Sequence, residues 1–202
     1  MKKVLLTMLT AVLMCCACTS GTSDEASGTD EEKRYDAMLR KTQWEKIVEE
    51  AAEHPIQSQA CYKVLRLAQF RLGQAGKEAI MECLLNSRDV LSSETAALMM
   101  SDVYFQLSMV NMAQRAAFEA LVTTQSANAK TRALQRLTET ALVTGQYEIA
   151  RKYISILEEE GSVNKWLKDI KPLAEHPERI EQHPVYQQLR QNHEKVEDQF
   201  FL

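Results

Sequence analysis

Histidines are the first residues in this sequence whose type could do chemistry. His176, His183 and His193 lie near one another along the chain and near several glutamates, a composition that would suit a metal ion. No two of them have the i, i+4 spacing that places two ligands on one helix face with a supporting partner. His54, His176 and His183 each precede a proline, which is typical of helix ends. The pattern therefore favours helix ends over a metal site.

Cysteines are the second such group. Cys61 and Cys83 are the only two beyond residue 18, and no histidine is placed to activate either thiol. Their positions are compatible with a disulfide and equally with two buried, reduced thiols. The motifs of phosphate-binding loops, zinc proteases and serine hydrolases are absent. We therefore predict no catalytic residue, no cofactor and no metal.

Two arginines are the third group. Arg132 and Arg136 are one helical turn apart, so their guanidinium groups can together bind a carboxylate or an acidic segment. The alternative is an ordinary solvated helix face on which Glu139 is their partner. Both interpretations need a helix that presents this face, which leads to the elements of the chain.

An internal repeat with a period of 37 residues organises residues 94–160. Apolar and small residues recur at helical spacing in both copies, with a break at residues 108–111 and again at 145–146. Each copy therefore predicts a helical hairpin, and alanines at 113, 117, 120 and 150 allow its helices to approach closely. The paired positions are Ala97/Leu134, Met100/Leu137, Ser101/Thr138, Tyr104/Ala141, Ser108/Gly145, Val110/Tyr147, Ala113/Ala150, Ala117/Ile154 and Ala120/Leu157.

These offsets resemble the tetratricopeptide repeat, a helix-turn-helix unit of about 34 residues. Tyr104, Ala113, Ala120, Gly145, Tyr147 and Ala150 fall on motif positions, whereas Ser101 and Thr138 replace the family's glycine. The resemblance implies an all-α fold, a short α-solenoid of such hairpins with a C-terminal capping helix. The chain also resembles an uncharacterised Bacteroidota family of repeat proteins.

The same resemblance implies a concave groove that binds a protein or peptide partner. Its partner-binding residues would be Asp102, Phe105, Gln106, Arg132, Arg136 and Glu139. Further groove positions would be Lys63, Phe70, Arg71, Thr95, Leu98, Gln135 and Leu142.

Two weaker repeats are expected before residue 94. Trp44 would hold the position of Val110 and Tyr147, which makes residues 35–53 a shortened first hairpin. Residues 56–72 and 77–86 would form a second hairpin. Its predicted core is Leu65, Ala68, Leu72, Ala79 and Cys83.

The N-terminal 17 residues resemble a bacterial lipoprotein signal peptide. Two lysines precede an apolar run at residues 4–14 that is too short to span a bilayer, and cysteines follow it. Cys18 follows the small residue Ala17 and is the expected lipid anchor, with Cys16 as the alternative. The resemblance implies a protein anchored through acyl chains in the cell envelope, at the outer membrane.

The remaining divisions follow from composition. Residues 18–33 are polar and acidic and predict a flexible tether, residues 34–160 the tetratricopeptide-like repeats, and residues 161–202 a helical cap. In that cap, Val185, Leu189, Val196 and Phe200 form an amphipathic stripe.

The net charge of the chain limits the classes of partner that we expect. The formal charge of −4 becomes −4 − 2 = −6 without the two lysines of the signal, which argues against nucleic acid. The expected function is a lipid-anchored adaptor or assembly scaffold. The alternative is an accessory solute-binding or enzyme-associated lipoprotein, for example in glycan uptake.

Overall fold

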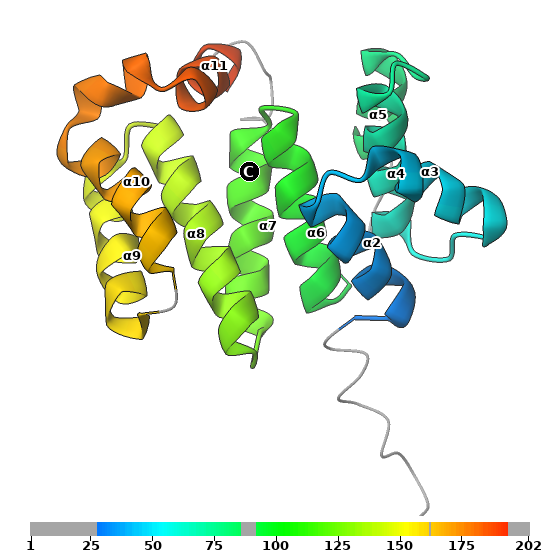
Figure 1. The fold of residues 1–202 in the computed structure, drawn as a ribbon, viewed down its shortest axis with the longest axis horizontal. Helices are drawn as coiled ribbons and strands as arrows, with labels where there is room; N and C mark the ends of the chain where they lie inside the picture. Colours follow the sequence, from blue (N-terminus) through cyan, green and yellow to red (C-terminus); the bar gives the residue numbers. More distant parts are fainter. Residues whose placement is uncertain (1–27, 86–91, 162, 194–202) are drawn as a thin grey trace, which may run out of the picture.

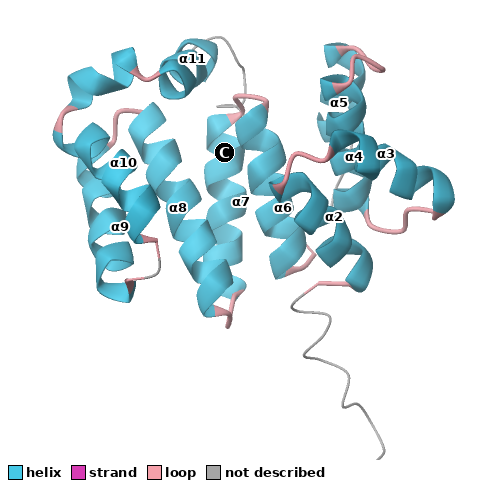
Figure 2. Ribbon diagram, in the orientation of Figure 1, coloured by secondary structure: helices cyan, strands magenta, loops and turns pink. Residues whose placement is uncertain are grey.

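The fold consists of helices alone over the residues that the computed structural model describes, which are 28–85, 92–161 and 163–193. This part of the chain forms ten α-helices and one 3-10 helix and no strand, and Figures 1 and 2 show their arrangement. The helices are α2 (Asp30–Arg40), α3 (Trp44–Glu53), α4 (Gln59–Arg71), α5 (Lys77–Leu85), α6 (Glu94–Gln106), α7 (Val110–Thr123), α8 (Ala127–Val143), α9 (Tyr147–Glu160), α10 (Asn164–Glu175), η1 (Pro177–Gln182) and α11 (Pro184–His193). The all-α prediction is confirmed.

The helices pack in chain order as antiparallel hairpins. Each hairpin, α2–α3, α4–α5, α6–α7 and α8–α9, contacts the next, and the first helices α2, α4, α6 and α8 also contact one another in that order. Helix α10 packs on α9, and η1 leads to α11, which returns to α8. This solenoid-like arrangement was the predicted architecture. In the predicted cap, Val196 and Phe200 lie outside the described residues, as do the signal peptide, Cys16 and Cys18.

The repeat is visible in the backbone of the hairpin turns. Thr42, Ser108 and Gly145 have positive φ angles of 50°, 63° and 76°. The latter two are 37 residues apart, the period of the repeat, and each of the three lies two residues before its second helix. Those helices begin at Trp44, Val110 and Tyr147, the three residues that the sequence analysis placed at one position of the repeat. Only glycine adopts this conformation without steric cost, so the first two turns hold a strained residue.

Small residues line the contact between paired helices. Ala113, Ala117, Ala120 and Ala150 are all fully buried, as predicted. The Ser101 hydroxyl donates a hydrogen bond of 3.0 Å to the Ala113 carbonyl oxygen across the α6–α7 contact. Such a contact is only reached when the facing side chains are small.

The predicted core of the second hairpin was wrong by one residue. The buried residues of α4 and α5 include Val64, Leu67, Ala68, Ile80 and Leu84, whereas most of the predicted set is only half-buried. The connection from α3 to α4 is two residues longer than the α7–α8 connection, and the turn from α4 to α5 is two residues longer than the α6–α7 turn. Each residue of shift rotates a helix face by about 100°, so the motif register does not transfer.

The N-terminal boundary also differs from the prediction. Helix α2 begins at Asp30, so residues 30–33 of the predicted tether belong to the fold. Thr29 caps it, and Glu32 completes a capping box by accepting from the Thr29 backbone N–H at 3.2 Å. The Glu32 carboxylate is buried and also accepts hydrogen bonds of 2.7 Å from the hydroxyls of Ser58 and Ser93, the N-caps of α4 and α6. One acidic side chain therefore joins the starts of three helices.

Arginine side chains hold the ends of other helices. Arg190 of α11 donates to the carbonyl oxygens of Leu142 and Val143 at 2.9 and 3.2 Å, the last residues of α8. Arg151 donates likewise to Ala174 O, near the end of α10, at 2.7 Å. A cation at a helix C-terminus satisfies free carbonyls and favours the helix dipole. These contacts fix α11 across the end of α8.

Among the residues that the structure describes, none of the helices combines the length and the apolar character needed to cross a bilayer.

Candidate functional site

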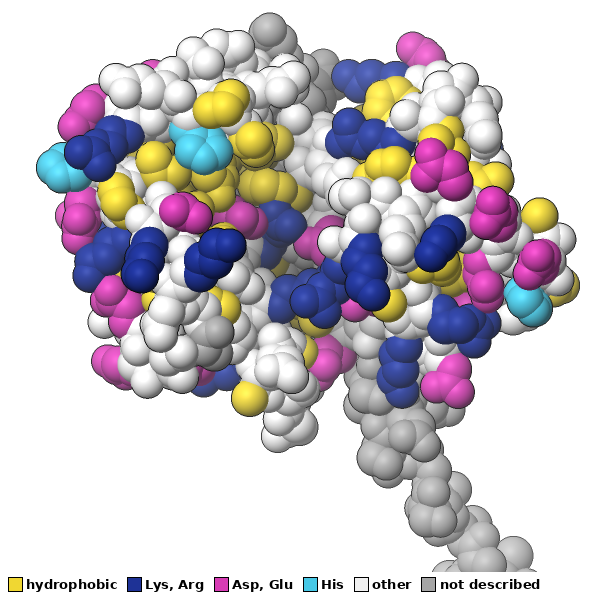
Figure 3. All heavy atoms as spheres, viewed as in Figure 1, with side chains coloured by type: hydrophobic (Ala, Val, Ile, Leu, Met, Phe, Trp, Pro, Cys, Tyr) yellow, Lys and Arg dark blue, Asp and Glu magenta, His cyan; other side chains and the backbone are white. Residues whose placement is uncertain are grey.

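A concave pocket of about 760 Å³ opens on the inner face of the hairpins. Its walls come from α2, α6, α8 and α10, and Figure 3 shows charged side chains of both signs gathered where this face is hollowed. Besides the charged residues described below, the lining includes Leu98, Thr42, Asn128, Gln135, Val163 and Trp166. The lining is thus mostly polar, with one indole.

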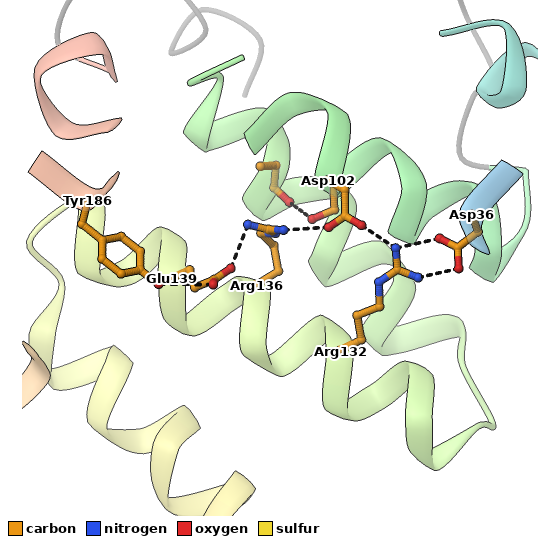
Figure 4. A network of polar contacts seen from close by, with 8 residues as sticks. Asp36, Asp102, Arg132, Arg136, Glu139 and Tyr186 are labelled. Carbon is orange, nitrogen blue, oxygen red and sulfur yellow. Dashed lines mark hydrogen bonds and ion pairs between the residues drawn. The ribbon is translucent and has the colours of Figure 1, made fainter. Parts of the chain in front are cut away.

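Acidic and basic side chains alternate along one wall of the pocket and form ion pairs with one another (Figure 4). Arg132 of α8 binds Asp36 of α2 through two parallel contacts, with Nη1 and Nη2 lying 2.9 and 2.7 Å from the carboxylate oxygens. Its Nη2 also donates to Asp102 of α6 at 2.5 Å. The second oxygen of Asp102 accepts from Arg136 Nη2 at 2.7 Å. Two arginines of α8 thus hold α2 and α6 in place.

The series continues toward the C-terminal helix. Arg136 Nη1 lies 2.7 Å from Glu139, and the Tyr186 hydroxyl of α11 donates to Glu139 at 3.2 Å. The Arg136 guanidinium also stacks over the ring of Phe105, with Cζ 3.9 Å from the ring centroid. We call Asp36, Asp102, Arg132, Arg136, Glu139 and Tyr186 the polar ladder. It connects α2, α6, α8 and α11.

The ladder's charged members are largely removed from solvent. The side chains of Asp102, Arg132 and Arg136 are 15, 17 and 16% exposed. Burial alone would raise the pKa of Asp102, but the guanidinium groups of Arg136 and Arg132 outweigh it and lower that pKa. Burial and the Glu139 carboxylate both raise the pKa of Tyr186. These shifts favour an ionised aspartate and a neutral phenol, the states that the ion pairs and the hydrogen bond to Glu139 require.

Asp36 is the ladder member that the sequence analysis missed. Asp36, Asp102 and Glu139 each lie eight residues before the start of a second helix, at Trp44, Val110 and Tyr147. One position of the repeat therefore carries an acid in three hairpins. The signal was present in the sequence, because the alignment that identified Trp44 also places Asp36 beside Asp102.

Most of the predicted groove residues do line the pocket. Asp102, Gln106, Arg132, Arg136 and Glu139 are among its walls, together with Thr95, Leu98 and Gln135. Phe105 lies beneath Arg136 instead, only 8% exposed.

Lys63 and Leu142 were wrongly assigned to the groove. Both are fully buried, and the Lys63 ammonium donates to the Leu84 carbonyl oxygen at 3.2 Å, which places it between α4 and α5. Phe70 and Arg71 line a different cleft, near α11. Three of these four lie on α4, which follows a connection two residues longer than the one before α8.

The predicted alternative for the arginines is half right. Arg136 does pair with Glu139, but the pair is buried in the ladder and not on a solvated face. Both arginines have internal carboxylates as partners, so an incoming acid would have to replace Asp36, Asp102 or Glu139.

None of the cysteines and histidines in the described ranges lines the concave pocket. Cys61 and Cys83 are not joined in a disulfide, and burial raises the pKa of each thiol. His54 and His176 occupy the C-cap positions of α3 and α10, the helix ends that the prolines predict. Over the same residues, no group of three potential ligands is arranged to hold a metal ion.

One cation at the pocket differs from the others. Arg40 ends α2 and lines the pocket with an exposed side chain. Within the described residues it forms no ion pair. It is therefore placed to contact a ligand without the loss of an internal partner.

Comparison with known proteins adds a family and no activity. Residues 2–202 match a protein family described as a family of unknown function, DUF6057. The chain belongs to this family. No curated protein and no solved structure matches it.

Proposed function

We propose that this member of the family is a lipid-anchored protein of the bacterial cell envelope, whose tetratricopeptide-like repeats bind a protein or peptide partner as an adaptor or assembly scaffold. The observation that carries the proposal is the concave pocket of about 760 Å³, walled by four helices. Successive helical hairpins create concave surfaces of this kind, which suit an extended segment or a helix of a partner.

Charge refines the kind of partner. The pocket lining has three arginines (40, 132 and 136) and four acids (36, 94, 102 and 139), so its sum is 3 − 4 = −1. Because the ladder already neutralises two of the arginines, a strongly acidic peptide would find little uncompensated positive charge. A segment with neutral polar groups and at most one carboxylate, directed to Arg40, suits the pocket better.

Photo-crosslinking in living cells tests the proposal. A photoreactive residue in place of Gln135 should capture a discrete protein, because the Gln135 side chain lines the pocket. The same residue in place of Phe118, which is 53% exposed on α7 and lines none of the pockets described here, is the matched control. Equal capture from both positions, or capture from Phe118 alone, would contradict a partner site in the concave pocket.

A charge reversal then tests the chemistry with the captured partner. Arg40→Glu should weaken its binding by roughly tenfold or more, the effect of losing one charge-assisted hydrogen bond. Lys46→Glu on α3 makes the same charge change at an exposed site outside the pocket and should leave binding unchanged.

A second candidate function rests on Trp166, whose indole is half-buried in the pocket wall. An aromatic wall beside polar groups also suits a soluble small molecule, as an accessory solute-binding lipoprotein would require. This candidate predicts no protein crosslink from Gln135. It predicts instead a ligand-induced thermal shift that Trp166→Ala removes.

The anchor has a separate test. Cys18→Ser should move the protein from the membrane fraction to the soluble fraction, because the acyl chains supply the membrane affinity. Cys16→Ser is the matched control and should leave the protein in the membrane fraction. The opposite result, with release only by Cys16→Ser, would place the anchor at Cys16.

A further inference from the structure

A second cleft, of about 380 Å³, lies between hairpin α4–α5 and helix α11 at the C-terminal end of α6. Its walls combine apolar and polar side chains. The apolar side chains that line it are Phe70, Phe105, Leu107, Val185 and Leu189.

Val185 is the uncovered part of this apolar surface. It is 54% exposed, whereas Tyr186 and Leu189 on the same helix are 5 and 7% exposed. A single exposed apolar residue is ordinary, but here it stands inside a cleft with other apolar walls. The cleft thus has the composition of a docking surface for an apolar segment.

The charges of the cleft have one sign. Arg71 and Lys77 are the charged residues of its lining, and no acid is among them. Arg71 donates to the Gln106 carbonyl and side-chain oxygens at 3.0 and 3.3 Å, so its charge is not neutralised by a carboxylate there. Lys77 forms no ion pair within the described part of the chain. An occupant should therefore be acidic as well as apolar.

We propose that residues 194–202 of the same chain dock in this cleft. They follow directly on α11, and Asn192, near the end of that helix, lines the cleft. Glu194, Glu197 and Asp198 against Lys195 give the segment a charge of −3 + 1 = −2, which complements the two cations. Its apolar residues are Val196, Phe200, Phe201 and Leu202.

Residues 194–202 are long enough to cross the cleft. Nine residues span up to about 30 Å when extended, or about 14 Å as a helix. Either length crosses a cleft of this volume from its α11 wall. The docked segment joins the C-terminal cap to the second hairpin, and the phenylalanines cover Val185.

Alkylation of an introduced thiol tests this in the full chain. The Val185→Cys thiol should react roughly tenfold more slowly with neutral iodoacetamide than the Val122→Cys thiol, because a docked segment shields only the first. Val122 is the matched control, since it is 58% exposed on α7 and lines neither pocket. Site-resolved mass spectrometry separates these thiols from Cys61 and Cys83.

Three further results decide between the proposal and its alternatives. Adding Phe200→Ser and Phe201→Ser to Val185→Cys should raise the alkylation rate of its thiol to that of the Val122→Cys thiol. Adding Lys77→Glu to Val185→Cys should also raise this rate. Equal rates for the two thiols with the natural segment would overturn the proposal. Shielding that persists in the double serine variant, or that depends on protein concentration, would assign the cleft to another occupant and overturn it as well.

Discussion

Replacing Arg132 with methionine should cost about 3 to 5 kcal/mol of unfolding free energy, the range for removing one partner from a buried ionic network. Arg132 separates the Asp36 and Asp102 carboxylates, and its removal leaves the two facing each other with most of their surface buried. Methionine keeps much of the side-chain volume, so the loss reports the charge and its hydrogen bonds. Urea denaturation at neutral pH measures it.

Controls separate the network from a general effect of losing an arginine. Arg179→Met removes an exposed arginine of η1 and should change stability by less than about 0.5 kcal/mol. Adding Asp36→Asn and Asp102→Asn to Arg132→Met should recover part of the loss, because the like charges are then gone. Equal stability of Arg132→Met and Arg179→Met would contradict the role given to the ladder.

The stability contributed by the ladder should depend on pH in a direction that urea denaturation at several pH values can check. The folded-state pKa of Asp102 lies below its ordinary value of 3.8, so the ladder's contribution is complete above that pH and is lost as the pH falls through the lowered pKa. The stability difference between the natural protein and Arg132→Met should therefore shrink on acidification below about pH 4. A difference that grows at acid pH would contradict this assignment.

Glu32→Ala is expected to cost about 3 kcal/mol, although composition alone would place this residue in a solvated tether. Its carboxylate accepts hydrogen bonds from Thr29, Ser58 and Ser93, and the net contribution of a hydrogen bond to a charged group is about 1.5–3 kcal/mol. Alanine leaves two buried or half-buried hydroxyls without this acceptor. Thermal or urea unfolding measures the change.

Two further variants test whether the stability loss of Glu32→Ala comes from the hydrogen bonds of its carboxylate. Glu32→Gln keeps one acceptor oxygen and the capping-box geometry, so it should lose clearly less stability than Glu32→Ala. Glu53→Ala removes an exposed acid from the last turn of α3 and should be close to neutral. If Glu32→Ala and Glu53→Ala lose the same unfolding free energy, the hydrogen bonds of Glu32 at the starts of α2, α4 and α6 do not contribute to stability.

Helical periodicity made the fold predictable where the turns keep one length. The 37-residue period related the turn at Gly145 to that at Ser108, and Trp44 holds the repeat position of Val110 and Tyr147, which are likewise first residues of their helices. It failed in the second hairpin, where the connection before α4 is two residues longer than the one before α8 and the turn after α4 is two residues longer than those of the later hairpins, and Lys63 is buried in the core and not in the expected groove. A pattern of apolar spacing gives the face of a helix only when the register is known.

The site was predictable to a lesser degree. Position in the repeat correctly assigned Asp102, Arg132, Arg136 and Glu139 to one surface, but it says nothing of which charges find partners inside the chain. That depends on how closely α2 approaches α8, a tertiary contact. The local sequence did hold one unused signal, since Thr29 followed three residues later by Glu32 is a capping-box pattern.

The described part of the fold begins at Gly28, only a short distance along the chain from Cys18, the proposed lipid anchor. Gly28 is buried with φ of 101°, and a Cβ atom there would lie 2.7 Å from Thr95 Cβ, so the chain is already packed on α6 at that residue. If the protein is anchored at Cys18, as we propose, nine residues separate the anchor from Gly28, a span of at most about 35 Å. The proposed anchor would then hold the pocket near the membrane surface, where a partner held in the same bilayer has a higher effective concentration than one free in the compartment.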